Sequence, residues 1–171
     1  MTGAPLPALL AEVMQAIENP RLSLPKDVFY FISQLTPMVN VDLLIKNASG
    51  ETLLTWRADE FYGPGWHIPG GILRFKEHAA TRIQKVAESE LDASVTAEAT
   101  PVVVREVMAP HRDIRGHFIS MLYRCKLTSM PDEAHRFDPG NPRNNQWMWH
   151  KGCPANIIPQ HEAYRSLIDG P

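Results

Sequence analysis

A glycine pair followed by an amphipathic helix constrains this chain more than any other feature. Gly70 and Gly71 carry no Cβ, so the backbone at this point can approach a ligand closely. Residues 78–91 contain neither proline nor glycine, and their apolar side chains recur with the period of an α-helix. The segment therefore predicts a glycine turn that leads into a helix packed on a core.

A carboxylate lies on the apolar face of this predicted helix. Glu90 falls in the middle of the arc defined by Ala79, Ile83, Val86 and Ala87. An unpaired carboxylate on a packed face is strongly disfavoured by desolvation, so Glu90 should have a cation or hydrogen-bond donors opposite it. Together with the glycine pair, this indicates a site for a metal and a phosphate. The alternative is that Glu90, in the last turn, bends back into water.

The spacing of Gly71, Glu77 and Glu90 resembles the Nudix box, G-x5-E-x7-R-E-U-x-E-E-x-G-U, in which U is a bulky apolar residue. Four other box positions differ from the family pattern and hold Lys85, Val86, Ser89 and Asp92. The resemblance implies a Nudix-type α/β/α sandwich with a mixed sheet. We expect a Nudix domain over residues 36–171, preceded by an N-terminal helical extension over residues 1–35.

Upstream residues are similar to one branch of that family, the GDP-mannose mannosyl hydrolases. The similarity covers roughly residues 35–95 and includes Thr36–Asp42, Asn47–Glu51, Arg57 and Gly65–Gly71 in order and spacing. It implies Mg²⁺, or Mn²⁺ in its place, as the cofactor, a nucleoside diphosphate sugar as the ligand, and a homodimer. The metal ligands that it implies are the Gly70 carbonyl, Glu90 and Glu77.

The same resemblance assigns Asp42 and Arg57 to the nucleotide-sugar site. Arg57 is also a catalytic candidate, because a guanidinium can neutralise the charge that develops on a departing diphosphate. Glu90 is catalytic through the metal. The alternatives are an edge-facing carboxylate for Asp42 and a solvated strand-end arginine for Arg57.

A general base is less clearly marked. The loop 109–117 contains His111 with Arg112 and Arg115, so it could supply a base and contact phosphate, or it could be an ordinary connection between strands. His117 is an open alternative to His111. Four of the seven histidines fall where they could face a cleft, namely His67, His111, His117 and His135. Where the branch has a Gln-His pair that supplies a metal ligand and the base, this chain has Arg143 and Asn144, which can do neither.

Phe61 and Tyr62 lie in a predicted loop beside the glycine turn, where one of them could stack on a nucleobase. The alternative is that both belong to the core. A formal net charge of −2 without a long basic block gives no footprint for nucleic acid. No run of eighteen apolar residues and no secretion signal is present, so we expect a cytoplasmic protein without a membrane partner.

Hydrophobic periodicity and turn residues predict the remaining elements. The expected helices are Ala8–Glu18, Lys26–Leu35 and Pro159–Ile168. The expected strands are Met38–Lys46 and Glu51–Trp56, joined as a hairpin, then Val102–Met108, His117–Leu127 and Trp147–Trp149. Residues 129–145 are expected to form a loop.

Two classes of function follow. The first is an Mg²⁺-dependent hydrolase of a nucleoside diphosphate linked to a sugar, which attacks either the sugar carbon or a phosphorus atom. The second is a catalytically silent Nudix scaffold that binds nucleotide sugars or regulates another protein. The second class is motivated by Val86, Ser89, Arg143 and Asn144, which replace functional residues of the family.

Overall fold

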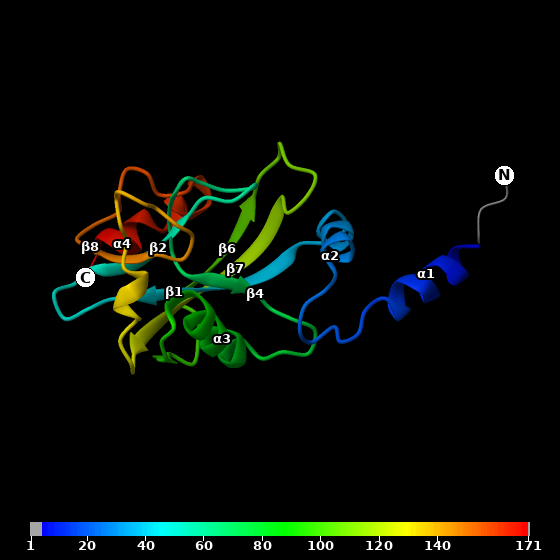
Figure 1. Ribbon diagram of the computed structural model, residues 1–171, viewed down its shortest axis with the longest axis horizontal. Helices are drawn as coiled ribbons and strands as arrows, with labels where there is room; N and C mark the ends of the chain where they lie inside the picture. The colour runs from blue at the N-terminus through cyan, green and yellow to red at the C-terminus, as the bar shows by residue number, and fades with distance from the viewer. Residues whose placement is uncertain (1–4, 171) are drawn as a thin grey trace.

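Strand β1 (Met38–Ile45) lies inside the larger of two sheets in the computed structural model (Figure 1). It runs parallel to the long strand β7 (His117–Leu127) and antiparallel to β4 (Gly70–Ile72). Strands β5 (Val95–Ala97) and β6 (Val103–Met108) both pair antiparallel with β7. The five strands therefore form the mixed sheet that the sequence predicts.

A second sheet lies beside the first. Strand β2 (Thr52–Arg57) is at its centre, between β3 (Gly65–His67) and β8 (Trp147–His150), and both neighbours are antiparallel to it. Chain segments separated by almost a hundred residues thus meet in one sheet. This arrangement brings the end of β2 and the loop after it to the edge of the larger sheet (Figure 1).

The prediction that the first two strands form a hairpin is wrong. Strands β1 and β2 belong to different sheets and share a single antiparallel bridge, between Lys46 and Thr52. Leu53 and Leu54 point to opposite sides of β2, and both are completely buried in separate apolar clusters. Strand β2 therefore has an apolar cluster on each of its faces. Its hydrogen-bonding partners are β3 and β8 of its own sheet, not β1.

Helix α3 (Ala79–Leu91) covers one face of the larger sheet, as the box predicts. Its side chains Ile83, Val86 and Leu91 are buried against the odd-numbered residues of β1. A Cβ on Gly71 would lie 2.7 Å from Val86 Cγ2, so only glycine lets the helix pack this closely on β4. This contact fixes the position of the carboxyl end of the helix relative to the glycine pair.

The C-terminal segment covers the opposite face, and its form differs from the continuous helix predicted over Pro159–Ile168. It begins as a 3₁₀ helix, η2 (Pro159–Tyr164), and continues as α4 (Arg165–Asp169). Residues three apart eclipse each other in a 3₁₀ helix, so His161 and Tyr164 share one side. Their rings meet edge to face at 5.6 Å between centroids. With helical elements on both faces of a mixed sheet, the fold is the α/β sandwich that the sequence predicts.

The two N-terminal helices have different surroundings. Helix α1 (Leu6–Gln15) buries none of its residues and lies apart from the sheets (Figure 1). Helix α2 (Lys26–Ser33) packs beside the loop after β2, where Tyr30 donates a hydrogen bond of 2.8 Å to Glu60. The second helix therefore contributes to the same end of the molecule as the glycine pair.

The structure describes residues 5–170. The first four residues of the predicted extension and Pro171 lie outside this range, and the division into residues 1–35 and 36–171 stays a prediction. The predicted loop 129–145 contains one short 3₁₀ helix, η1 (Glu133–His135). Among the described helices, none combines the length and the apolar character needed to cross a lipid bilayer.

Candidate active site

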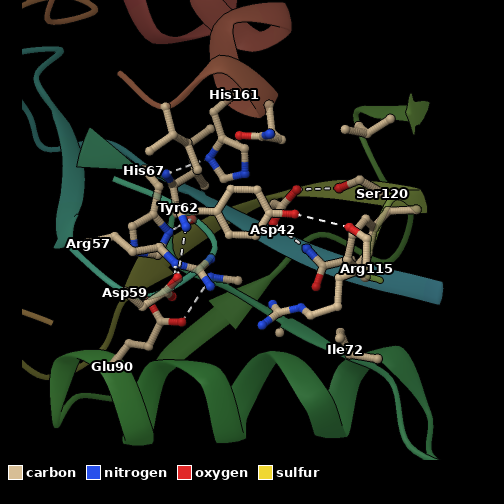
Figure 2. Close-up of a pocket in the computed structure, with 18 of the residues that line it drawn as sticks. Asp42, Arg57, Asp59, Tyr62, His67, Ile72, Glu90, Arg115, Ser120 and His161 are labelled. Carbon is tan, nitrogen blue, oxygen red and sulfur yellow. Dashed lines mark hydrogen bonds and ion pairs between the residues drawn. The ribbon is translucent and has the colours of Figure 1, made fainter. Parts of the chain in front are cut away.

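A cavity of about 440 Å³ opens where β1 and β4 meet the loop after β2, the end of α3 and the 3₁₀ helix η2 (Figure 2). The structure brings six of the residues predicted for the site to its walls: Asp42, Arg57, Tyr62, Gly70, Glu90 and Arg115. Four others are absent from the walls: Phe61, Glu77, His111 and Arg112.

Glu90 lies in the last turn of α3 with its carboxylate toward the cavity. Its Oε2 atom accepts a hydrogen bond of 3.2 Å from Thr55 Oγ1, and Oε1 accepts a long one of 3.4 Å from the Gly70 amide. Burial raises the pKa of Glu90 to about 7, and these two neutral donors only partly offset it. The carboxylate thus has donors opposite it, as predicted, but no cationic side chain bonded to it.

The backbone of Gly70 is available to a ligand. Asp42 and Gly70 lie directly opposite each other in the antiparallel ladder, and the next amide, of Leu43, donates to Pro69 O. Hydrogen-bonded and non-hydrogen-bonded pairs alternate in such a ladder, so Asp42 and Gly70 form a non-hydrogen-bonded pair. The amide and carbonyl of Gly70 therefore point away from β1, toward the edge where Glu90 lies.

Asp42 is almost completely buried, and donors surround it. Asn40 Nδ2 donates to Oδ1 at 2.6 Å, while the hydroxyls of Ser120 and Tyr164 donate to Oδ2 (Figure 2). Burial nevertheless raises the pKa of Asp42 to about 7. A Cβ on Gly70 would collide with Oδ1 of this carboxylate. The alternative prediction, that Asp42 is an edge-facing carboxylate, is therefore wrong. The Asp42 side chain is part of the internal wall of the cavity.

Two arginines from different segments line the cavity, Arg57 at the end of β2 and Arg115 in the loop between β6 and β7. Arg57 Nε pairs with Asp59 Oδ2 at 2.6 Å, and its guanidinium lies 4.5 Å from the centroid of the Tyr62 ring. Arg115 lies 4.8 Å from the centroid of the Phe61 ring, and its buried Nε has no hydrogen-bond partner within residues 5–170. Burial, followed by the nearby Arg57, lowers the pKa of Arg115. Two guanidinium groups thus line the cavity, and Asp59 pairs with only one of them, Arg57.

Glu77 has a different environment from Glu90. Oε1 pairs with Lys85 at 2.9 Å, and Oε2 pairs with Arg82 at 2.7 Å and accepts the Arg74 amide at 3.0 Å. Burial opposes ionisation, but the hydrogen bonds from Lys85, the Arg74 amide and Arg82 prevail and lower the pKa of Glu77 to about 2. All of its partners come from the chain itself. Its role as a metal ligand stays a prediction.

The loop 109–117 contributes to the cavity mainly through Arg115. His111 is exposed and is not among the wall residues, so its role as a base stays a prediction. Arg112 donates to the Phe61 carbonyl and stacks at 4.3 Å from the Tyr62 centroid. It therefore supports the aromatic loop from outside the cavity. Asn144, at the position of the family's base, does line the cavity, but its Oδ1 accepts the Ala58 amide at 2.6 Å.

Sequence reasoning missed several wall residues. Ser120, Tyr164 and His161 are far from the box in the sequence. Only the tertiary fold brings the hydroxyls of Ser120 and Tyr164 to Asp42 and places His161 in the wall of the same cavity. The one local signal was the i, i+3 spacing of His161 and Tyr164 after Pro159. A histidine before an aromatic residue in a short helix is too common to indicate a site.

The available oxygen donors suit a hard divalent cation. Among the described residues, no three His, Cys, Asp or Glu side chains gather as a ready metal cluster. The Glu90 carboxylate and the outward Gly70 carbonyl are nevertheless the kind of donors that Mg²⁺ takes, together with waters and a substrate phosphate. The raised pKa of Glu90 fits this set, because a carboxylate without an internal cation gains most from an external one.

Comparison with solved structures identifies the fold as that of the Nudix hydrolases. The chain superposes on a MutT Nudix hydrolase from Burkholderia pseudomallei with a TM-score of 0.56 and 20% identity, covering 71% of this chain and 90% of that one. It superposes on a Nudix-family hydrolase from Clostridium perfringens with a TM-score of 0.56 and 14% identity, covering 78% and 95%. An ADP-ribose pyrophosphatase from Streptococcus suis gives a TM-score of 0.52 and 17% identity, covering 78% and 90%.

Curated proteins with similar sequences include one of archaeal origin. The low-salt glycan biosynthesis protein Agl8 of Haloferax volcanii is 31% identical over 90 residues, which is 53% of this chain. The match spans 57% of the length of that relative. No protein-family model matches the sequence.

Proposed function

We propose that this protein is an Mg²⁺-dependent hydrolase, with Mn²⁺ as a substitute, acting on a nucleoside diphosphate linked to a sugar in the manner of the GDP-mannose mannosyl hydrolases. One observation carries the proposal. The Glu90 carboxylate, which has no cationic hydrogen-bond partner within residues 5–170, lies beside the outward-facing Gly70 backbone. The same cavity is lined by Arg115 and Arg74, each with a buried Nε that has no partner in that range. Negative and positive groups are thus both left for a ligand that brings a cation and phosphates.

Glu90 and the Gly70 carbonyl would hold the metal, and Thr55 orients the carboxylate through its 3.2 Å hydrogen bond. The bound Mg²⁺ supplies charge that polarises the diphosphate and stabilises it as a leaving group. Arg57 and Arg115 line the cavity and can bind the phosphate oxygens, so that negative charge developing on departure meets fixed positive groups.

The similarity to the Haloferax protein supports a sugar-linked substrate, because that relative is a glycan biosynthesis protein. Two bonds remain candidates for cleavage. Attack at the sugar carbon releases nucleoside diphosphate and free sugar. Attack at phosphorus releases a nucleoside monophosphate and a sugar phosphate. The cytoplasmic location and the homodimer stay predictions.

A second function, a silent nucleotide-sugar-binding scaffold, is favoured by the environment of the altered box. Val86 replaces a carboxylate of the family pattern and is buried against Gly71 as part of the core. Glu77, which the resemblance makes a metal ligand, is held by Arg82 and Lys85. Of the two glutamates kept from the box pattern, only Glu90 lines the cavity. A single box carboxylate can suffice to bind Mg²⁺ with a ligand without being sufficient for turnover.

The decisive experiment is incubation of the purified protein with Mg²⁺ and a panel of nucleoside diphosphate sugars in ¹⁸O-water, with products identified by mass spectrometry. Label in the free sugar supports attack at carbon, and label in a phosphate product supports attack at phosphorus. Absence of turnover across the panel, with Mg²⁺-dependent binding retained, would favour the silent scaffold. Absence of both turnover and binding would contradict both proposals.

A further inference from the structure

The peptide group of Ile68 orients two histidines at the wall of the cavity, the buried His67 and the half-buried His161. The Ile68 amide lies 2.9 Å from His161 Nδ1, and the Ile68 carbonyl oxygen lies 2.9 Å from His67 Nδ1. The two rings are 6.0 Å apart between centroids. Both histidines are among the residues that line the cavity (Figure 2).

The chemistry of a peptide group fixes which nitrogen of each ring carries the proton. A backbone N–H can only donate, so His161 Nδ1 must accept, and in the neutral ring the proton is on Nε2. A backbone carbonyl can only accept, so His67 Nδ1 carries the proton. Its Nε2 is then an acceptor that lies 3.0 Å from Thr55 Oγ1, whose single proton serves either this nitrogen or Glu90 Oε2. His161 is thus a hydrogen-bond donor toward the cavity, whereas His67 is used within the wall.

The donor of His161 has no partner in the protein. No hydrogen bond connects its Nε2 to any residue between 5 and 170, although burial, then the neighbouring His67 and Arg57, lowers the pKa of His161 and keeps the ring neutral. The adjacent Gln160 also lines the cavity, and its buried Oε1 accepts no hydrogen bond within the same range. One short segment therefore presents an unused neutral donor next to an unused neutral acceptor.

We propose that Gln160 and His161 form a subsite that binds hydroxyl groups of the substrate, which makes them specificity-determining residues for the sugar. A hydroxyl donates one hydrogen bond and accepts others, so it can satisfy the Gln160 acceptor and the His161 donor together. This inference rests on the proposed function, because it assigns the sugar of a nucleoside diphosphate sugar to this end of the cavity.

The charge distribution along the cavity favours hydroxyls over phosphate at this subsite. Arg74 and Arg115 also line the cavity, and each has a buried Nε without a partner among the described residues. Phosphate oxygens gain more from guanidinium groups than from a neutral imidazole and amide. The diphosphate therefore belongs with the arginines, and the uncharged part of the ligand belongs with Gln160 and His161.

Nitrogen-15 NMR of the full chain tests the subsite without requiring turnover. The histidine side-chain spectrum of the wild type should show His161 as the Nε2–H tautomer. Free mannose should shift the His161 signals, and inorganic phosphate at the same concentration should leave them in place. A proton on Nδ1 of His161, an equal or larger response to phosphate, or no response to mannose would overturn the proposal.

Two matched variants test the role of the donor in affinity. His161→Asn retains an acceptor at the Nδ1 position for the Ile68 amide and removes the Nε2 donor, whereas His161→Gln retains a donor at the Nε2 position. Calorimetry with Mg²⁺ should show that His161→Asn weakens the binding of GDP-mannose by about tenfold, the effect of losing one hydrogen bond, while the affinity for GDP is unchanged. His161→Gln should recover part of the loss. The exposed His135, on η1 outside the cavity, gives the control His135→Asn.

The outcomes separate the subsite from the proposed function. Equal losses of GDP and GDP-mannose affinity in His161→Asn, or no loss of either, would overturn the subsite even if the protein hydrolyses nucleotide sugars. Conversely, a mannose response at His161 in a protein without Mg²⁺-dependent nucleotide binding or turnover would support the subsite and contradict the proposed function. Circular dichroism of each variant would show whether a loss comes from misfolding.

Discussion

Glu77 and Glu90 belong to the same box and flank the same helix, but the fold gives them opposite environments. Glu77, before α3, is surrounded by Arg82, Lys85 and a backbone amide, and its pKa falls to about 2. Glu90, in the last turn, has only Thr55 and the Gly70 amide, and its pKa rises to about 7. Glu77, whose charge is paired with side chains of the protein, stabilises the fold. Glu90, which lacks such partners, is available to bind a ligand.

The largest expected effect comes from removing the charge of Glu90. Glu90→Gln should lower the hydrolysis rate with Mg²⁺ about 100-fold or more, because the substituted amide cannot replace the charge that holds the metal. The melting temperature should stay level or rise, since a half-buried carboxylate without a cationic partner is removed. Glu88→Gln, on an exposed position of the same helix, is the matched control. A fall in stability with no change in Mg²⁺ response would contradict the contrast.

The same substitution at Glu77 should change stability. Glu77→Gln should lower the free energy of unfolding by about 2–3 kcal/mol, because Arg82 and Lys85 lose a partner whose side chain is 5% exposed. Urea denaturation measures this change. Titration with Mg²⁺ then sharpens the comparison. If Mg²⁺ affinity falls as much as in Glu90→Gln, Glu77 is a metal ligand, and the interpretation that it only stabilises the fold is wrong.

The two carboxylates should also give stability opposite dependences on pH. The pKa of Glu90 is raised from 4.5 to about 7, so the folded state binds more protons in this interval and stability falls as pH rises through it. The pKa of Glu77 is lowered to about 2, so its contribution is present above its ordinary value and is lost on acidification toward about pH 2. Without Mg²⁺, Glu90→Gln should remove about 1–2 kcal/mol of the decrease between about pH 5 and about pH 8. If the free energy of unfolding of Glu90→Gln depended on pH in the same way as that of the wild type, the raised pKa of Glu90 would be contradicted.

The smallest effect is expected at Lys85, which occupies the position of the family's arginine. Its side chain is 44% exposed, and it forms the outer of the two ion pairs to Glu77. Lys85→Gln should therefore lower the free energy of unfolding by less than about 0.5 kcal/mol and leave hydrolysis unchanged. Arg82→Gln, at a side chain that is 13% exposed, should cost more in the same urea assay. Equal effects at the two positions would show that exposure does not rank these pairs.

The sequence predicted long, strongly patterned elements well and short ones poorly. Helix α3 and strands β1, β6 and β7 lie close to their expected ranges, because each spans six residues or more and its hydrophobic pattern is long enough to see in the sequence. Strands β4 and β5 have three residues each, too few for a period to be visible, and β4 consists of two glycines and Ile72. The hairpin prediction failed because turn residues indicate a reversal of the chain, but they do not show which sheet the next strand joins.

For the candidate site, residues near the box were predictable and distant ones were not. The position of Glu90 on an apolar arc indicated an unusual carboxylate, and the structure gives it the expected neutral donors at the cavity. His111 looked like a base from its polar loop, but the chain leaves it exposed and places Arg115 of the same loop in the wall. Local composition shows which groups are available, and only packing decides which way each one points.

The sequence by itself determined the box helix, the glycine pair before it and the carboxylate of Glu90 on its apolar face. These features depend on local periodicity and on the absence of a Cβ. The tertiary structure alone decided that Glu77 is neutralised and Glu90 is not. It also decided that the 3₁₀ turn of η2 brings His161 to the peptide of Ile68, more than ninety residues earlier in the chain. Charge, burial and tautomer depend on neighbours in space, and those neighbours come from segments whose separation in sequence carries no information about their contact.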